Sequence, residues 1–181
     1  PIYLIYPIFL KDGQNCKEEI ASLPNNFRWS IDQLIPEVEK CMELGIMTYD
    51  LFPAVDDALK DKTATYSYAE ENFYLHAIRT LKETFPEIVL MSDVAMDPYS
   101  SDGHDGLVEN GKILNDATLP ILNKMALAQA QAGIDIIGPS DMMDGRVGSI
   151  REYLDQHQFT DVSIMSYSVK YASAFYGPFR D

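Results

Sequence analysis

The chain has little cysteine. Its 181 residues include only Cys16 and Cys41, which form no CxxC pattern and stand beside no clustered histidines. A disulfide framework and a structural zinc site both need closely spaced groups of such ligands. The sequence therefore predicts two free thiols and neither kind of cross-link.

Basic residues are also scarce. The 14 Lys and Arg residues stand against 28 Asp and Glu residues, which gives a formal net charge of −14. A surface of that sign repels phosphate backbones and anionic lipid headgroups. We therefore expect neither nucleic acid nor a membrane surface as a partner.

Long hydrophobic runs are missing. No apolar run reaches the roughly 18 to 20 residues that a membrane-spanning helix needs. The first residues, PIYLIYPIFL, lack the basic segment and the small-residue cleavage site of a signal peptide. These features predict a cytoplasmic protein, and the 46% hydrophobic content is enough for one sizeable core.

What the chain does contain is an alternation of two patterns. Five apolar, β-rich runs recur, and amphipathic helical stretches separate most of them. The runs are IYLIYPIF (2–9), IMTYDLF (46–52), EIVLMSDV (87–94), IDIIGPSD (134–141) and VSIMSYS (162–168). Nearly continuous apolar strands are typical of a parallel sheet covered by helices. The sequence predicts a single α/β domain over 1–181.

Two helical stretches have recognisable ends. In the stretch 115–134, Asn115 is expected to cap the helix and Gly133 to end it. In the stretch 30–46, Gly45 is expected at the end. Two segments between these units, 11–28 and 53–71, are polar and are expected to be excursions from the sheet.

The start of the earlier helix has two interpretations. Ser30 and Gln33 fit a capping box. Pro36, however, lacks the N–H that an inner helical turn needs, which favours a start near Ile35.

Polar side chains gather where three of the runs end. Asp93 ends one run, Ser140 and Asp141 end the next, and Lys170 follows the last. In parallel α/β proteins the active site lies at the carboxyl ends of the strands. We expect Asp93 to face such a site, and Asp141 to cap backbone N–H groups ahead of a helix. Arg146 is expected to form an ion pair.

Lys170 stands in apolar, aromatic surroundings that include Tyr171 and Phe175. Such surroundings disfavour an ammonium, and a neutral amine is the nucleophile that Schiff-base chemistry requires. An ordinary solvated lysine is the alternative. Arg180 fits a clamp for a substrate carboxylate or, equally, a surface ion pair with Asp181.

Three stretches resemble the porphobilinogen synthase family, also called 5-aminolevulinate dehydratase. They are SDVAMDPYSSDGHDG, GPSDMMDGR and MSYSVKYASAFYGPFRD. The resemblance runs from LIYPIF to the last residue, and PSDMMDGR and YASAFYGPFRD are unusual in residue choice. It implies a (β/α)8 TIM barrel that condenses two molecules of 5-aminolevulinate into porphobilinogen, with loss of two waters, for haem biosynthesis.

The resemblance also implies roles for single residues. Lys170 matches a lysine that forms a Schiff base with substrate, Asp93 an active-site aspartate, and Arg180 an arginine that holds a substrate carboxylate. Tyr176 and Ser140 lie in the matching motifs as substrate-binding residues. Members of the family assemble into homo-oligomers.

The loop SDVAMDPYSSDGHDG departs from the zinc-dependent members of the family. Their three cysteine ligands are replaced here by Ala95, Asp97 and Asp105, so no three-thiolate zinc site can form. Aspartate suits hard cations, so Asp97 and Asp105 are candidate ligands of Mg²⁺ or a monovalent cation that keeps most of its water. A solvated turn is the alternative, because Asp and Gly are common turn residues. His104 is either a proton shuttle or a plain hydrogen-bonding residue.

The extent of the resemblance leaves two hypotheses. A complete barrel takes about 250 residues, so the five βα units would be its first part and the second Schiff-base lysine would lie beyond Asp181. The chain is then either half of a working dehydratase or a catalytically silent half-barrel module. A class I aldolase-type enzyme would also use the lysine, but it has no use for PSDMMDGR and GPFRD.

Overall fold

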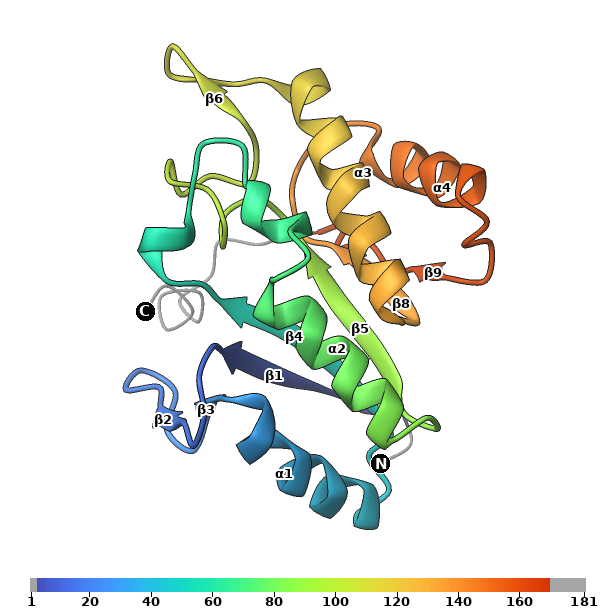
Figure 1. The fold of residues 1–181 in the computed structure, drawn as a ribbon. Helices are drawn as coiled ribbons and strands as arrows, with labels where there is room; N and C mark the ends of the chain where they lie inside the picture. The colour runs from blue at the N-terminus through green and yellow to red at the C-terminus, as the bar shows by residue number, and fades with distance from the viewer. Residues whose placement is uncertain (1–2, 170–181) are drawn as a thin grey trace.

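Five parallel strands form the centre of the structure, a computed structural model that describes residues 3–169. The strands are β1 (Ile5–Lys11), β4 (Thr48–Ala54), β5 (Val89–Val94), β8 (Ile136–Pro139) and β9 (Ser163–Ile164). They lie side by side in chain order (Figure 1). All five predicted strands are therefore confirmed, and their carboxyl ends meet at one edge of the sheet.

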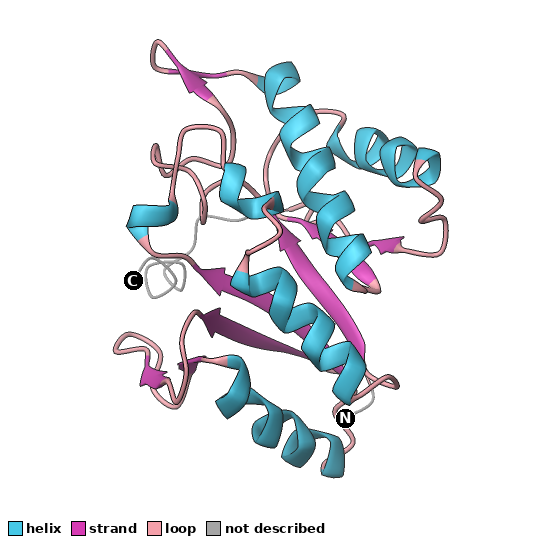
Figure 2. Ribbon diagram, in the orientation of Figure 1, coloured by secondary structure: helices cyan, strands magenta, loops and turns pink. Residues whose placement is uncertain are grey.

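Helices cover one face of this sheet, as Figure 2 shows. They are α1 (Ile31–Glu43), α2 (Phe73–Thr84), α3 (Asn115–Ala132) and α4 (Arg146–Gln156). Each helix buries an apolar stripe, for example Leu34 of α1, Ile78 of α2 and Ile150 of α4. Burying one such side chain contributes about 1.5 to 3 kcal/mol, so this layer holds most of the hydrophobic stabilisation.

The two faces of the sheet follow from the alternation of side chains along each strand. Tyr49 and Leu51 of β4 are fully buried on the helix side, where the Tyr49 hydroxyl donates to the Ile46 carbonyl at 2.7 Å. Asp50 between them points to the other side, which we call the open face. In register, Asp50 is flanked by Pro7 of β1 and Met91 of β5.

The two polar excursions carry short elements. In the first, β2 (Lys17–Glu19) pairs antiparallel with β3 (Phe27–Trp29), and β3 adds to the sheet parallel to β1. The second holds the 3-10 helices η1 (Asp57–Leu59) and η2 (Thr65–Tyr68). A small separate hairpin, β6 (Val108–Glu109) with β7 (Lys112–Ile113), follows β5.

The start of α1 differs from the start near Ile35. The helix begins at Ile31 and contains Pro36. The capping box does not form either, because the Ser30 hydroxyl donates to Asp32 Oδ1 at 2.6 Å and makes no capping bond. Ser30 also accepts the Cys16 N–H at 2.9 Å, and this anchor fixes the first turn although the proline lacks one backbone donor.

For the helix α3, the predicted end at Gly133 is confirmed and the predicted cap at its start is wrong. Gly133 ends it with a left-handed backbone, φ +102°, which glycine adopts without strain. The cap residue is Leu114, so the prediction of Asn115 as the cap is wrong. The Asn115 side chain instead accepts the Asp144 N–H at 2.7 Å and so ties α3 to the turn before α4.

No helix in the described part of the chain is both long enough and apolar enough to cross a membrane.

Candidate functional site

A hydrogen-bonded pair of side chains lies at the carboxyl ends of β5 and β8. The Ser140 hydroxyl donates to Asp93 Oδ1 at 2.5 Å. Gly138 stands directly opposite Asp93 in the sheet, and a Cβ at Gly138 would lie 2.6 Å from Met91 Cε and 2.8 Å from the Ser92 carbonyl oxygen. Only glycine therefore fits beside Asp93. The structure thus confirms the prediction that polar side chains at the ends of these two strands lie together.

Asp93 is an acid that tends to keep its proton. Only 7% of its surface is exposed, and this burial raises its pKa to about 8. The hydroxyl of Ser140 opposes the rise, whereas the negative charges of Asp97, Asp50 and Asp105 add to it. At neutral pH the protonated form therefore prevails, and a protonated carboxyl can donate a proton to a bound molecule.

Two buried side chains from the helix layer hold Asp93 in place by its backbone. The Gln129 amide of α3 donates to the Asp93 carbonyl at 2.9 Å, and its oxygen accepts the Ser92 hydroxyl at 2.6 Å. The Tyr74 hydroxyl of α2 accepts the Asp93 N–H at 3.3 Å and donates to the Leu51 carbonyl at 2.7 Å. Sequence analysis missed both residues, since each is one polar position in a helix with no local motif.

A second acid lies on the open face. The Tyr167 hydroxyl, which follows β9, donates to Asp50 Oδ2 at 2.8 Å. This bond crosses the two intervening strands, β5 and β8. Burial raises the pKa of Asp50, and the bond from Tyr167 opposes that rise. Asp50 was not among the predicted site residues, because it interrupts an apolar run without forming a motif.

Asp141 and Arg146 support the site from the side of α4. Asp141 Oδ1 accepts the Met143 N–H at 2.7 Å, so Asp141 caps a backbone group as predicted, although the cap residue of α4 itself is Gly145. Burial raises the pKa of Asp141 to about 6. The predicted ion pair of Arg146 is confirmed, with its Nε 3.4 Å from Asp141 Oδ2.

Arg146 also fixes the chain that follows β9. Its guanidinium donates to the Tyr167 carbonyl at 2.8 Å and to the Ser166 hydroxyl at 3.2 Å. Because Tyr167 is held in this way, its ring is positioned over the open face toward Asp50.

The loop after β5 does not gather a set of metal ligands. Ala95 is buried, Asp97 and His104 are exposed, and Asp105 is half-buried. Within residues 3–169, no group of three or more His, Cys, Asp or Glu side chains could hold a metal ion. The described residues therefore do not fit a closed metal site, and we derive no step through a metal. A hard cation bound mainly through water at Asp97 or Asp105 stays a prediction.

Three predicted site residues, Lys170, Tyr176 and Arg180, lie outside the described residues. Their predicted roles rest on the sequence motifs alone. The chain before Lys170 is described as far as Val169. The hydrogen bond from Tyr167 to Asp50 places this segment on the open face, the face of the sheet that also holds Asp93.

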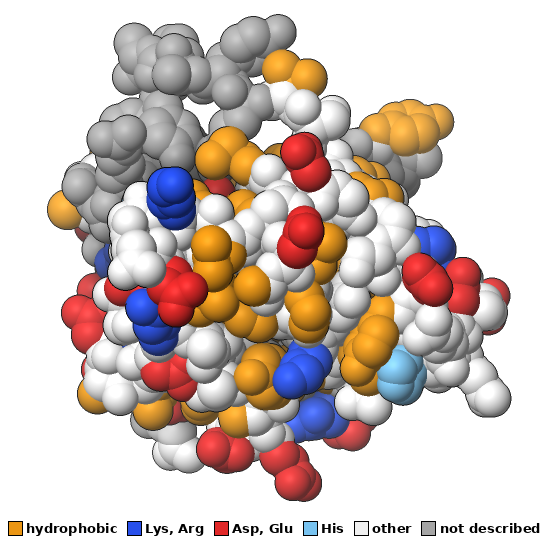
Figure 3. Space-filling model, turned by 90° about the horizontal axis from the view of Figure 1, so that it is seen from above, with side chains coloured by type: hydrophobic (Ala, Val, Ile, Leu, Met, Phe, Trp, Pro, Cys, Tyr) orange, Lys and Arg blue, Asp and Glu red, His pale blue; other side chains and the backbone are white. Residues whose placement is uncertain are grey.

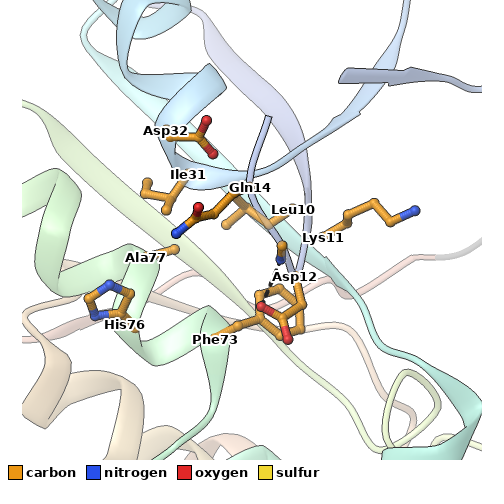
Figure 4. A pocket seen from close by; sticks show the side chains of 10 residues that line it. Leu10, Lys11, Asp12, Gln14, Ile31, Asp32, Phe73, His76 and Ala77 are labelled. Carbon is orange, nitrogen blue, oxygen red and sulfur yellow. Dashed lines mark hydrogen bonds between the residues drawn. The ribbon is translucent and has the colours of Figure 1, made fainter. Parts of the chain in front are cut away.

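A separate pocket of about 430 Å³ lies on the helix side of β1 (Figure 4). The end of β1 and the first turns of α1 and α2 line it, with Asp12, Asp32 and His76 as its charged or titratable side chains along with Lys11. Leu10 in its wall is a core residue that faces the helices. The pocket is therefore on the other side of the sheet from Asp93 and is no part of the candidate site.

Figure 3 shows the molecule from above, with hydrophobic side chains exposed among Asp and Glu side chains. Large apolar residues that stay exposed include Met142, Met165 and Tyr167, with 65%, 46% and 42% of their surface accessible.

Comparison with known proteins gives consistent matches. A family model described as delta-aminolevulinic acid dehydratase matches residues 1–181. The delta-aminolevulinic acid dehydratase of Bradyrhizobium diazoefficiens is 53% identical over 98% of this chain and 50% of its own length. That of Chlamydia pneumoniae is 50% identical over 100% of this chain and 54% of its own length. The chain thus spans about half the length of the curated relatives it matches.

A solved structure extends the likeness to the fold. The crystal structure of the delta-aminolevulinic acid dehydratase (porphobilinogen synthase) of Toxoplasma gondii, in complex with the reaction product porphobilinogen, superposes with a TM-score of 0.95 at 50% identity. The match covers 99% of this chain and 51% of that chain. The five βα units are thus the first part of a (β/α)8 barrel, and the chain belongs to the delta-aminolevulinic acid dehydratase family.

Proposed function

We propose that the chain supplies the first half of a porphobilinogen synthase barrel, which condenses two molecules of 5-aminolevulinate to porphobilinogen with loss of two waters. The observation that carries this proposal is the buried Asp93 carboxyl, bonded to Ser140, at the carboxyl ends of the strands in a member of this family. Active sites of parallel barrels lie at this end.

Lys170 is proposed as the nucleophile. Its neutral amine adds to the substrate ketone, the carbinol oxygen leaves as water, and an imine remains. Loss of that water needs a proton on the leaving oxygen. Asp93 is proposed as the donor, because burial raises its pKa to about 8 and keeps a proton on it at neutral pH. Ser140 orients the Asp93 carboxyl, and Arg180 and Tyr176 are proposed to bind substrate, Arg180 at its carboxylate.

A second candidate is a half-barrel that does not turn over substrate. This is the alternative for a chain that spans about half the length of the curated relatives it matches. On this reading the residues of the site are present, but Lys170 is an ordinary solvated amine.

Borohydride reduction in the presence of 5-aminolevulinate separates the two candidates. Hydride reduces an imine to a stable secondary amine, so peptide mass mapping reveals the lysine that reacted. We expect the adduct on Lys170, none in a Lys170→Arg variant, and an unchanged adduct in the control Lys112→Arg, whose side chain is exposed on β7. A folded sample without an adduct would mean that the chain alone is not an enzyme.

The remaining expectations stay proposals of the same kind. A homo-oligomer and a cytoplasmic location are predicted for this chain, although relatives in plants are named chloroplastic. Mg²⁺ or a monovalent cation at Asp97 or Asp105 would appear as a change in bound metal when both are replaced by Asn.

A further inference from the structure

Asp50 is a buried carboxyl that the proposed reaction does not use. It lies in the middle of β4, and only 7% of its surface is exposed. Its neighbours Tyr49 and Leu51 face the helices, so Asp50 lies on the open face, the same face as Asp93. In register it stands beside Met91, two residues before Asp93 on β5. The two acids are therefore one layer apart in the barrel interior.

The two oxygens of Asp50 differ. Oδ2 accepts the Tyr167 hydroxyl at 2.8 Å, which fixes the orientation of the carboxyl. Oδ1 is shielded from solvent and has no hydrogen-bond partner within the described part of the chain. A buried carboxylate oxygen without a partner is costly, so such an oxygen marks a place for a hydrogen-bond donor that arrives from elsewhere.

The chemistry of that donor follows from the charges around it. Arg146 pairs with Asp141, and Lys11 pairs with Glu18. No positive side chain among residues 3–169 stabilises the charged form of Asp50; only the Tyr167 hydroxyl does. The carboxyls of Asp50 and Asp93 also repel each other when charged. A cation is the donor that relieves both effects.

We propose that Asp50 binds the primary ammonium group of a substrate molecule in the barrel interior, with Oδ1 as the acceptor and Tyr167 as the residue that orients the carboxyl. The inference rests on the proposed function, since 5-aminolevulinate carries such an ammonium on the carbon next to its ketone, at the opposite end of the molecule from its carboxylate. Asp50 thereby distinguishes the amino ketone from keto acids that lack the amine.

The test compares two ketones. A neutral Lys170 amine can form an imine with either of them, and borohydride reduces that imine to a stable adduct. The first is 5-aminolevulinate, and the second is 4-oxopentanoate, which has the same ketone and carboxylate but no amine. For each we measure the concentration that gives half-maximal borohydride-trapped adduct on Lys170. The variant Asp50→Asn keeps the size of the side chain and an oxygen that can accept the Tyr167 hydroxyl, but it removes the charge.

In Asp50→Asn we expect the half-maximal concentration of 5-aminolevulinate to rise about tenfold or more, because a charged hydrogen bond is lost. The value for 4-oxopentanoate should change less than about twofold. Tyr167→Phe keeps the carboxylate, so it should retain most of the preference for the amine. Asp161→Asn, an exposed acid at the other end of the sheet, should match the unchanged chain.

Two outcomes would overturn the inference. Equal weakening of both compounds in Asp50→Asn would mean that Asp50 acts on Lys170 or on the fold and not on the substrate amine. An unchanged preference would mean that the amine binds elsewhere. Failure of the unchanged chain to trap either compound is a different result, which overturns the proposed function for this chain and removes the basis of the inference with it.

Discussion

The two faces of the sheet are built on different principles. On the helix side, Tyr49, Leu51 and Leu90 are fully buried, and the polar atoms among them find partners, as the Tyr49 hydroxyl does. On the open face, Asp50 and Asp93 are buried acids with raised pKa values, and Met165 is exposed. One face stabilises the fold, whereas the other stores unfavourable electrostatic energy where chemistry is proposed to occur.

The largest difference between the two faces is expected in the free energy of unfolding that is lost when an apolar side chain is shortened. Leu90→Ala removes a fully buried side chain on the helix side and should lower the free energy of unfolding by about 2 to 5 kcal/mol. Met165→Ala on the open face, where 46% of the residue is exposed, should cost less than about 1 kcal/mol. Urea denaturation of both variants measures this. Equal losses would show that the open face is packed as tightly as the helix side.

The second test concerns the raised pKa of Asp93. The free carboxyl of an unfolded chain has a pKa of about 3.9, and in the folded protein that of Asp93 is about 8. Between these values the folded state holds the proton that the unfolded state has released. Stability is therefore present at low pH and is lost as the pH rises toward 8, by up to about 1.4 kcal/mol per pH unit for this group.

The variant Asp93→Asn removes that contribution. We expect its stability to decline less between pH 6 and about 8 than that of the unchanged chain, because no carboxyl at this position remains to release a proton. Below pH about 6 a residual slope should persist, since Asp141 also has a raised pKa, of about 6. Urea denaturation across this pH range gives both slopes. Parallel curves for the two proteins would contradict a protonated Asp93.

Gln129 of α3 connects the helix layer to β5, the strand that carries Asp93. Its buried amide bonds to the Ser92 hydroxyl and the Asp93 carbonyl, so Gln129→Ala removes one hydrogen bond from each and should destabilise the protein by about 1 to 3 kcal/mol. Gln131→Ala, two residues on and exposed, is the matched control and should change stability by less than about 0.5 kcal/mol. If the two variants were equally stable, the amide would not be what holds β5 to α3.

The features of the fold and the site that could be predicted from the sequence are those that depend on local contacts. The five strands were predictable because each is a continuous apolar run, and Gly133 because the end of a helix is a local event. The capping prediction for Asn115 failed because a tertiary partner, the Asp144 backbone, competes for its side chain. Asp93 and Ser140 were found from their place at strand ends.

Asp50 shows what a sequence pattern omits. Its partner Tyr167 is 117 residues away, and the bond between them exists only because β4 and β9 are strands of one curved sheet. Within the run TYDLF the aspartate is a single polar residue, and nothing nearby indicates which face it occupies. The strands β2 and β3 were missed for a related reason, since three residues are too few to establish a periodicity.

The smallest expected effect concerns the hydroxyl of Ser140. Its bond to Asp93 lowers the pKa of that carboxyl against the effect of burial. Ser140→Ala should therefore raise the pKa of Asp93 further, by less than about one unit, which corresponds to under ~1.4 kcal/mol. The infrared band of the protonated carboxyl, followed as the pH rises, would persist to higher pH in Ser140→Ala and be absent in Asp93→Asn. An unshifted titration would mean that burial alone sets the proton affinity of Asp93, and the open face would then owe its chemistry to desolvation, without help from the neighbouring strand.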